Sequence, residues 1–218
     1  MYSTETISIL GYHDEPVPHT FFKQDATTDH LTIILPGRGY TAQMPLLFYP
    51  ITLLLDQGAD VLRADYAYDR LPTFGTLSFD QQLRWLWSDV SAACRAGLSQ
   101  RAYQQVTVIG KSLGTLAMGH LLTTETLPPR VNAVWLTPLV RFEPLREQIK
   151  QFQGRSLFVI GTADSHYDPT ILADLHQTTG GEVVVVEGAD HGFNVKGDVL
   201  RSIRVVEQAV RAIQTFLD

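Results

Sequence analysis

A chain of 218 residues with 44% hydrophobic and 18% charged residues is typical of one globular domain that buries a continuous core. Its net charge of −6 argues against a nucleic-acid surface, and its scattered Lys and Arg residues provide no polybasic run for an anionic membrane. One cysteine, Cys94, excludes an intrachain disulfide, and no apolar run reaches the roughly 18 residues that span a bilayer, so we expect a cytoplasmic protein.

The first predicted strands are short. Residues 1–30 are mixed and polar, and alternating stretches at 6–10 and 19–23 predict edge strands of an antiparallel start to a sheet. The continuous apolar run at 31–35 predicts a buried strand. That strand ends in Pro36-Gly37-Arg38-Gly39-Tyr40, a glycine-rich loop whose backbone N–H groups can face an anion.

Two helices and a strand are predicted next. Residues 44–57 predict a helix and residues 59–64 a short strand. The polar, aromatic loop at 65–69 follows at the same edge of the sheet, where it either lines a pocket or connects elements in solvent. Residues 78–96 predict a long amphipathic helix that Gly97 ends. The face of this helix expected to be buried holds Leu83, Leu86, Val90 and Ala93.

The stretch 106–115 is the most informative part of the sequence. Its first four residues predict a strand that runs directly into Gly110-Lys111-Ser112-Leu113-Gly114, and apolar residues continue behind it at helical spacing. A serine between such a strand and helix lies at a strained corner with its hydroxyl exposed. Gly110 and Gly114 lack a Cβ, so strand and helix can approach closely. A phosphate-binding P-loop is excluded, because that motif needs a glycine at position 105, where Gln stands.

Strands and helices continue to alternate after this turn. Strands are predicted at 131–136, 156–160 and 182–187, and helices at 170–178 and 199–217. The last helix carries an apolar stripe that we expect to face the sheet. This stripe consists of Leu200, Ile203, Val206, Val210, Ile213 and Leu217. The alternation predicts an α/β fold with a mostly parallel central sheet, helices on both faces and a single domain over residues 1–218.

Three side chains that can act together each follow a predicted strand. They are Ser112, Asp164 and His191, in that order along the chain. Reacting groups gather beyond the carboxyl ends of the strands in a sheet of this kind. A serine hydroxyl needs a base to take its proton during attack. His191 would be that base, and Asp164 would fix its tautomer and stabilise the imidazolium.

Other residues near these loops are alternative candidates for the acid and the base. Asp168 precedes Pro169 and is expected to cap the following helix. Asp190 lies beside the histidine and is the third choice for the acid, because neighbouring residues in an extended loop point opposite ways. His166 could also reach the site, but the position of His191 just before the last helix favours His191 as the base.

These features together resemble the α/β-hydrolase family. The chain has a nucleophile elbow at 110–114, a loop similar to the family's oxyanion loop at 35–39, an acid loop at 161–164 and a histidine loop at 188–191. Pro36 stands where many members have a histidine. The resemblance covers the chain from about residue 30 to its end, and it implies the α/β-hydrolase fold.

The negative charge of an acyl-transfer intermediate would be held by backbone N–H groups. The residue after the nucleophile, Leu113, supplies one, and the glycine-rich loop supplies the other. Within that loop we favour the N–H of Arg38 over that of Gly39. The Arg38 and Lys111 side chains are expected near the mouth of the site, where they either favour an acidic acyl or alcohol group or stand solvated.

The resemblance also indicates the kind of chemistry. Family members often insert a lid in the interval that is 136–156 here, and this interval has room for one helix only, so no sizeable cap domain is expected. That resembles small carboxylesterases and dienelactone-hydrolase-like enzymes, and the serine favours ester chemistry. The implied activity is hydrolysis of a small carboxylic ester or thioester through an acyl-enzyme on Ser112. A small-molecule substrate is the implied partner, no metal or organic cofactor is needed, and the oligomeric state stays open.

Other functions remain compatible with this sequence. Amide hydrolysis, or acyl transfer to a nucleophile other than water, would use the same residues. A non-catalytic member of the same fold could bind a small molecule or a partner, because fold alone does not decide function. A carbon–carbon or halogen-transfer enzyme would need a different oxyanion environment. The intact set of Ser112, Asp164 and His191 favours the hydrolase.

Overall fold

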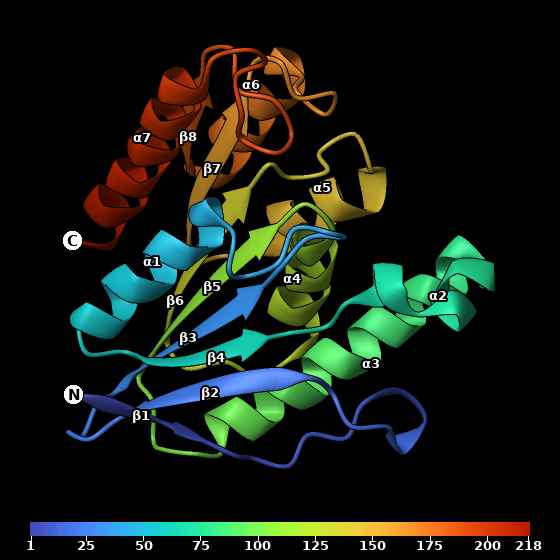
Figure 1. Ribbon diagram of the computed structural model, residues 1–218, viewed down its shortest axis with the longest axis vertical. Helices are drawn as coiled ribbons and strands as arrows, with labels where there is room; N and C mark the ends of the chain where they lie inside the picture. Colours follow the sequence, from blue (N-terminus) through green and yellow to red (C-terminus); the bar gives the residue numbers. More distant parts are fainter.

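An eight-stranded sheet runs through the middle of the computed structural model, which describes residues 1–218 (Figure 1). The strand order is β1-β2-β4-β3-β5-β6-β7-β8. β1 and β2 pair antiparallel with their neighbours, and the six strands from β4 to β8 in this order are parallel. The strands are β1 (Tyr2–Glu5), β2 (His19–Gln24), β3 (His30–Leu35), β4 (Asp60–Ala64), β5 (Gln105–Lys111), β6 (Arg130–Leu136), β7 (Arg155–Gly161) and β8 (Glu182–Val186). The predicted mostly parallel α/β sheet is confirmed.

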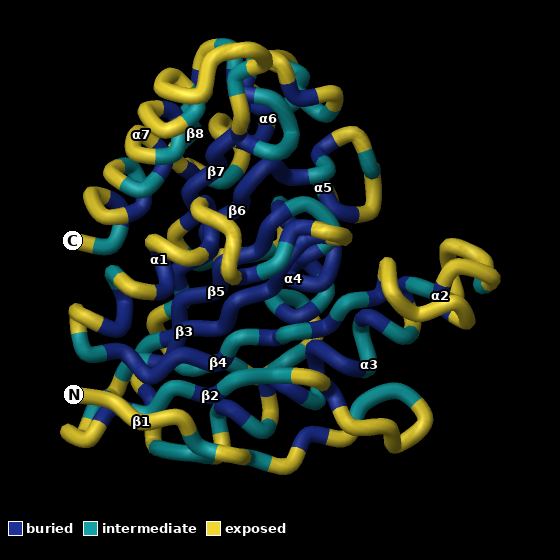
Figure 2. Tube along the Cα trace, viewed as in Figure 1, coloured by how far each residue is buried: buried dark blue, intermediate teal, exposed yellow.

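Helices cover both faces of the sheet. They are α1 (Pro45–Asp56), α2 (Pro72–Thr76), α3 (Phe79–Leu98), α4 (Leu113–Thr124), α5 (Glu143–Gln151), α6 (Pro169–Thr179) and α7 (Val199–Leu217), with 3-10 turns at Tyr12–Asp14 and Tyr68–Arg70. One core of 22 buried residues lies between the sheet and the helices α1 and α7. A second core of 32 buried residues lies on the other face, under α3, α4, α5 and α6. Figure 2 shows the central strands buried between these layers, with the outer helix surfaces exposed.

The helix that the sequence places at 78–96 is α3. Ser78 begins it with a capping box: the Ser78 hydroxyl accepts from the Gln81 N–H, and the Gln81 side chain accepts from the Ser78 N–H. The four apolar residues predicted to face the core are all buried. Gly97 does not end the helix, which continues to Leu98. A Cβ on Gly97 would lie 2.9 Å from a methyl carbon of Leu62, so this glycine lets α3 pack closely on β4.

The predicted strand at 6–10 is wrong. The first strand is β1, where Tyr2 pairs with Gln24 and Glu5 with Phe21 of β2. After β1 the chain leaves the sheet, and Leu10 makes only an isolated bridge with Pro16. The apolar alternation in this stretch has another cause: Ile9 is buried against the core from a loop.

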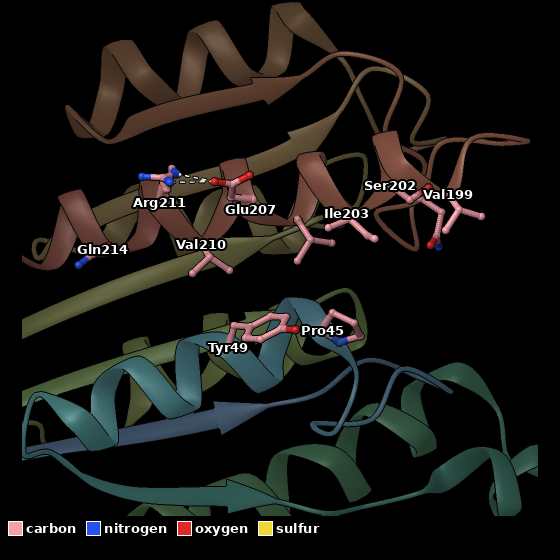
Figure 3. Close-up of a pocket in the computed structure, with 11 residues that line it drawn as sticks. Pro45, Tyr49, Val199, Ser202, Ile203, Glu207, Val210, Arg211 and Gln214 are labelled. Atoms are coloured by element: carbon pink, nitrogen blue, oxygen red, sulfur yellow. Dashed lines mark hydrogen bonds and ion pairs between the residues drawn. The ribbon is translucent and has the colours of Figure 1, made fainter.

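The apolar stripe predicted for the last helix is displaced around the helix. The residues of α7 that are buried are Val205, Ala209, Ile213 and Phe216, so only Ile213 belongs to the predicted set. Leu200 and Ile203 are 68% and 62% exposed. Val199, Ile203, Val206 and Val210 instead line a groove of about 650 Å³ between α7 and α1. Figure 3 shows Ile203 and Val210 facing Pro45 and Tyr49 of α1 across the groove.

Candidate active site

The turn between β5 and α4 holds the serine in a strained conformation. Ser112 has φ 52° and ψ −116°, although it is not a glycine. Such a backbone conformation costs free energy and persists only where the surroundings enforce it. A Cβ on Gly110 would lie 2.7 Å from the carbonyl oxygen of Gly114, so strand and helix meet as closely as the sequence predicted. The hydroxyl of Ser112 therefore stands at the carboxyl edge of the sheet.

Three side chains from three loops form one hydrogen-bonded chain. The Ser112 Oγ lies 2.8 Å from Nε2 of His191. Nδ1 of the same imidazole lies 2.8 Å from Oδ2 of Asp164. Because an ionised carboxylate only accepts hydrogen bonds, Nδ1 carries a proton in this arrangement and Nε2 is free to accept the serine proton. The structure thus brings together the serine, histidine and aspartate that the sequence singled out.

The environment of Asp164 favours its ionised form. Its side chain has no exposed surface, and Oδ1 accepts a 2.8 Å hydrogen bond from the His166 N–H. Burial alone would raise the pKa of this carboxyl, but the hydrogen bonds from His191 and from the His166 backbone outweigh burial and hold the pKa below its ordinary value. Asp164 is therefore a carboxylate at neutral pH.

The other candidate acids have structural roles. Asp168 is the N-cap of α6, where its carboxylate accepts from the N–H groups of Thr170 and Ile171 at 3.1 and 3.2 Å, as the sequence predicted. The Asp190 carboxylate turns back onto its own loop and accepts from the N–H groups of Gly192 and Asn194 at 2.8 Å. Neither carboxylate contacts His191 through a hydrogen bond.

His166 lies beside the site without joining the chain of hydrogen bonds. Its ring centroid is 5.4 Å from that of His191. The His166 Nδ1 is buried and has no hydrogen-bond partner. Burial lowers the pKa of His166, so the neutral ring is favoured. Its contribution to the site is the backbone N–H that it donates to Asp164.

The glycine-rich loop after β3 packs directly on the turn that holds Ser112. A Cβ on Gly37 would lie 3.2 Å from Cβ of Ser112, and the Gly37 N–H donates to the Tyr40 carbonyl at 3.2 Å. The Tyr66 hydroxyl, from the loop after β4, donates to the Pro36 carbonyl at 2.9 Å and fixes the start of this loop. The sequence did not reveal this contact. The loop after β4 also lines a cavity of about 390 Å³, together with Pro36 and Ala42.

Two backbone N–H groups near the serine are free to donate. Arg38 is exposed, and its N–H makes no hydrogen bond within the protein. Leu113 is the first residue of α4, so its N–H belongs to the first turn, which lacks intrahelical acceptors. The role of these two groups as oxyanion donors stays a prediction.

The expected position of Lys111 at the mouth of the site is wrong. Its side chain is only 2% exposed, and its Nζ donates to the His191 carbonyl oxygen at 2.9 Å. Side chains alternate between the two faces of a strand, so Lys111 shares the face of Ile109, which lies in the core beneath α1 and α7. This two-residue spacing was the signal in the sequence that could have predicted the burial of Lys111.

The site is open to solvent. The Ser112 side chain is half-buried, and the His191 side chain is 35% exposed. Between β6 and β7 the chain forms only α5, so no helical lid lies in that interval. No group of three or more His, Cys, Asp or Glu residues is arranged to hold a metal ion. None of the helices combines the length and apolar character that crossing a membrane requires.

Comparison with known proteins identifies the fold. No family model matches the chain, and no curated protein matches its sequence. Its structure is similar to that of an esterase from Pyrococcus furiosus, with a TM-score of 0.68, 15% identity and coverage of 100% of this chain and 93% of that one. It is also similar to an α/β serine hydrolase without a lid from Xanthomonas campestris, with a TM-score of 0.68, 17% identity and coverage of 98% and 95%.

A third similar structure is an α/β serine hydrolase homologue from Coxiella burnetii, with a TM-score of 0.61, 17% identity and coverage of 97% and 96%. Each of the three alignments covers nearly all of this chain and nearly all of the other protein, so the similarity extends over the complete fold. The chain therefore has the α/β-hydrolase fold. Within that fold it resembles the members that lack a lid.

Proposed function

We propose that this protein is a serine hydrolase that cleaves a small carboxylic ester or thioester through an acyl-enzyme on Ser112. The observation that carries the proposal is the pair of 2.8 Å hydrogen bonds that join Ser112 to His191 and His191 to Asp164. A hydroxyl, an imidazole and a buried carboxylate in this order provide a nucleophile, a base and a group that stabilises the protonated base.

The proposed reaction has two halves. The Ser112 Oγ attacks the carbonyl carbon of the ester while Nε2 of His191 takes the serine proton, and Asp164 stabilises the resulting imidazolium. The N–H groups of Leu113 and Arg38 would hold the negative oxygen of the tetrahedral intermediate. Its collapse expels the alkoxide or thiolate, which receives the proton from His191. Water then attacks the acyl-serine with the same base, and the carboxylic acid leaves.

The substrate is proposed to be a small molecule that needs no metal or organic cofactor. A site without a lid and with a 35% exposed histidine gives free entry and encloses little of the substrate. The esterase and the lid-less hydrolase with similar folds support ester chemistry as the first choice.

Covalent labelling tests this function. A fluorophosphonate probe should add to the wild-type protein once, by intact mass, and should not add to Ser112→Ala. Ser165→Ala is the matched control, because Ser165 is an exposed serine that directly follows Asp164, and it should label like the wild type. A folded wild type that neither labels nor hydrolyses p-nitrophenyl acetate would refute the hydrolase and favour a binding protein of the same fold.

A further inference from the structure

Lys111 is a buried cation directly beneath the proposed active site. It is the last residue of β5 and is 2% exposed. Its Nζ donates to the carbonyl oxygen of His191 at 2.9 Å. The same ammonium lies 4.5 Å from the centre of the Tyr40 ring, within the range of a cation–π contact. One side chain therefore contacts the histidine loop and the glycine-rich loop together.

Packing does not require a lysine at this position. An ammonium has three N–H donors, and here one carbonyl is its only hydrogen-bond acceptor in the protein. Removing such a charge from water is costly, and an apolar side chain of similar volume often gives a more stable fold. The side chain lies on the sheet face that packs on α1 and α7, where the cluster of buried apolar residues includes Ile109 of the same strand. The charge of Lys111 therefore lowers the stability of the fold, and we look for its role in the proposed active site.

The hydrogen bond from Lys111 connects the backbone segments that carry Ser112 and His191. Lys111 is covalently joined to the proposed nucleophile, Ser112. The carbonyl that it binds belongs to the same residue as the proposed base. The Nζ–O bond thus links nucleophile and base by a second route, separate from the 2.8 Å contact between Ser112 Oγ and His191 Nε2. It holds the backbone of the histidine while the imidazole exchanges protons.

The glycine-rich loop is held at the same point. The Tyr40 hydroxyl accepts from the N–H of Leu46 in α1 at 3.0 Å, and its carbonyl accepts from the Gly37 N–H at 3.2 Å. Tyr40 is therefore fixed at both ends before the ammonium contacts its ring. Lys111 joins this loop to the histidine loop, which is also held by the Gly188 N–H, a donor to the Thr162 hydroxyl at 2.8 Å, and by the Ala189 carbonyl, which accepts from the Ala163 N–H at 3.0 Å.

We propose that Lys111 is a positioning residue that fixes the His191 backbone relative to Ser112, so that the imidazole stays within reach of the serine hydroxyl in both halves of the reaction. This inference rests on the proposed hydrolase function. It assigns to the second residue of the Gly-Lys-Ser-Leu-Gly turn a role in alignment, without contact to the substrate.

The charge of Lys111 should make this alignment depend on pH. The charged groups that face it are Asp164 of the acid loop and Asp190 of the histidine loop, and both favour the ammonium. Burial opposes them and dominates, and it lowers the pKa of Lys111 to about 8. The side chain is charged at neutral pH and becomes a neutral, weaker donor to the His191 carbonyl above about pH 8.

Substitution of Lys111 tests the proposal, with Lys196→Met as the matched control because Lys196 is an exposed lysine just beyond the histidine loop. With p-nitrophenyl acetate, Lys111→Met should lower kcat about 10- to 100-fold, the effect of a misaligned base, while KM stays within about twofold. Wild-type kcat should fall above about pH 8. Lys111→Met should lack this alkaline fall. Lys111→Arg, which keeps its charge at all these pH values, should recover part of kcat and also lack the fall.

A readout that does not depend on activity completes the test. Amide hydrogen exchange in the segment 188–194 should be faster in Lys111→Met than in Lys196→Met, because the loop has lost its bond to β5. Unchanged kcat together with unchanged exchange would overturn the role of Lys111 while leaving the hydrolase intact. A wild type that neither labels with the fluorophosphonate nor turns over would overturn the hydrolase itself, and the role of Lys111 with it.

Discussion

Gly114 lies against the end of β3 so closely that a Cβ on it would stand 1.9 Å from the carbonyl oxygen of Leu35. The carbonyl oxygen of Pro36 would be 2.8 Å away. The first turn of α4 therefore packs on the backbone of the strand that leads into the glycine-rich loop. This contact brings the N–H of Leu113 and the loop that contains Arg38 to the same corner of the molecule.

Replacing Gly114 with alanine should damage the fold. The clash is with backbone atoms, which cannot move aside as a flexible side chain can, so α4 must shift away from β3. We expect a loss of about 3 kcal/mol or more in the free energy of unfolding, measured by urea titration. Gly75→Ala in α2 is the control, because a Cβ there meets no atom within 4 Å. It should change stability by less than about 1 kcal/mol. Equal effects of the two substitutions would contradict this account.

Asp164→Asn should reduce catalysis far more than Asp168→Asn. The amide cannot stabilise an imidazolium and favours the wrong tautomer of His191, so kcat/KM should fall about 10³- to 10⁴-fold. Asp168 caps α6, and asparagine caps a helix about as well as aspartate, so Asp168→Asn should change kcat/KM little. Steady-state rates with p-nitrophenyl acetate measure both. The reverse ranking would identify Asp168 as the functional carboxylate.

The stability of the protein should reveal the cost of the buried Lys111 charge. Burial lowers the folded-state pKa of Lys111 from 10.5 to about 8. Between these values the unfolded chain binds more protons than the folded one, so this group makes the folded state more stable as pH rises from about 8 to 10.5. The full change is about 3 kcal/mol, from roughly 1.4 kcal/mol per pKa unit.

Urea titrations of wild type and Lys111→Met across this range measure that effect. At pH 7 the variant should be at least as stable as the wild type, because a methionine carries no charge to desolvate. Its advantage should shrink as pH rises from about 8 to 10.5. A difference in the free energy of unfolding that stays constant over this pH range would mean that the charge of Lys111 does not destabilise the folded state.

That Ser112, His191 and Asp164 lie close together could be predicted from sequence because each belongs to the loop or turn that follows an apolar strand. The register of the parallel strands aligns the starts of their loops. Leu35 of β3 lies opposite Gly110 of β5, so the loops after these two strands start at the same level. Lys111 could not be placed as readily, because a lysine is ordinarily exposed. Its burial depends on a carbonyl from a loop 80 residues further along the chain.

The helices were predicted more accurately in extent than in orientation. α7 begins and ends where the apolar pattern indicated, at Val199 and Leu217. Two apolar stripes run along it, however, and the sequence alone does not say which one faces the sheet. The buried stripe includes Ala209, a small residue that allows the helix to lie close to the sheet, and ends at Phe216. The other stripe lines the groove beside α1 (Figure 3).

Two isoleucines of α7 test this orientation as a matched pair. Ile213 is fully buried and Ile203 is 62% exposed, on the same helix. Ile213→Ala would leave a cavity in the core beneath α1 and α7, and should cost about 2–5 kcal/mol of the free energy of unfolding. Ile203→Ala removes mostly exposed surface, and alanine favours the helix, so stability should stay within about 0.5 kcal/mol. Chemical denaturation of the two variants at one protein concentration gives both numbers. If Ile203→Ala were as destabilising as Ile213→Ala, the stripe first indicated by the sequence, which contains both isoleucines, would be the one that faces the sheet.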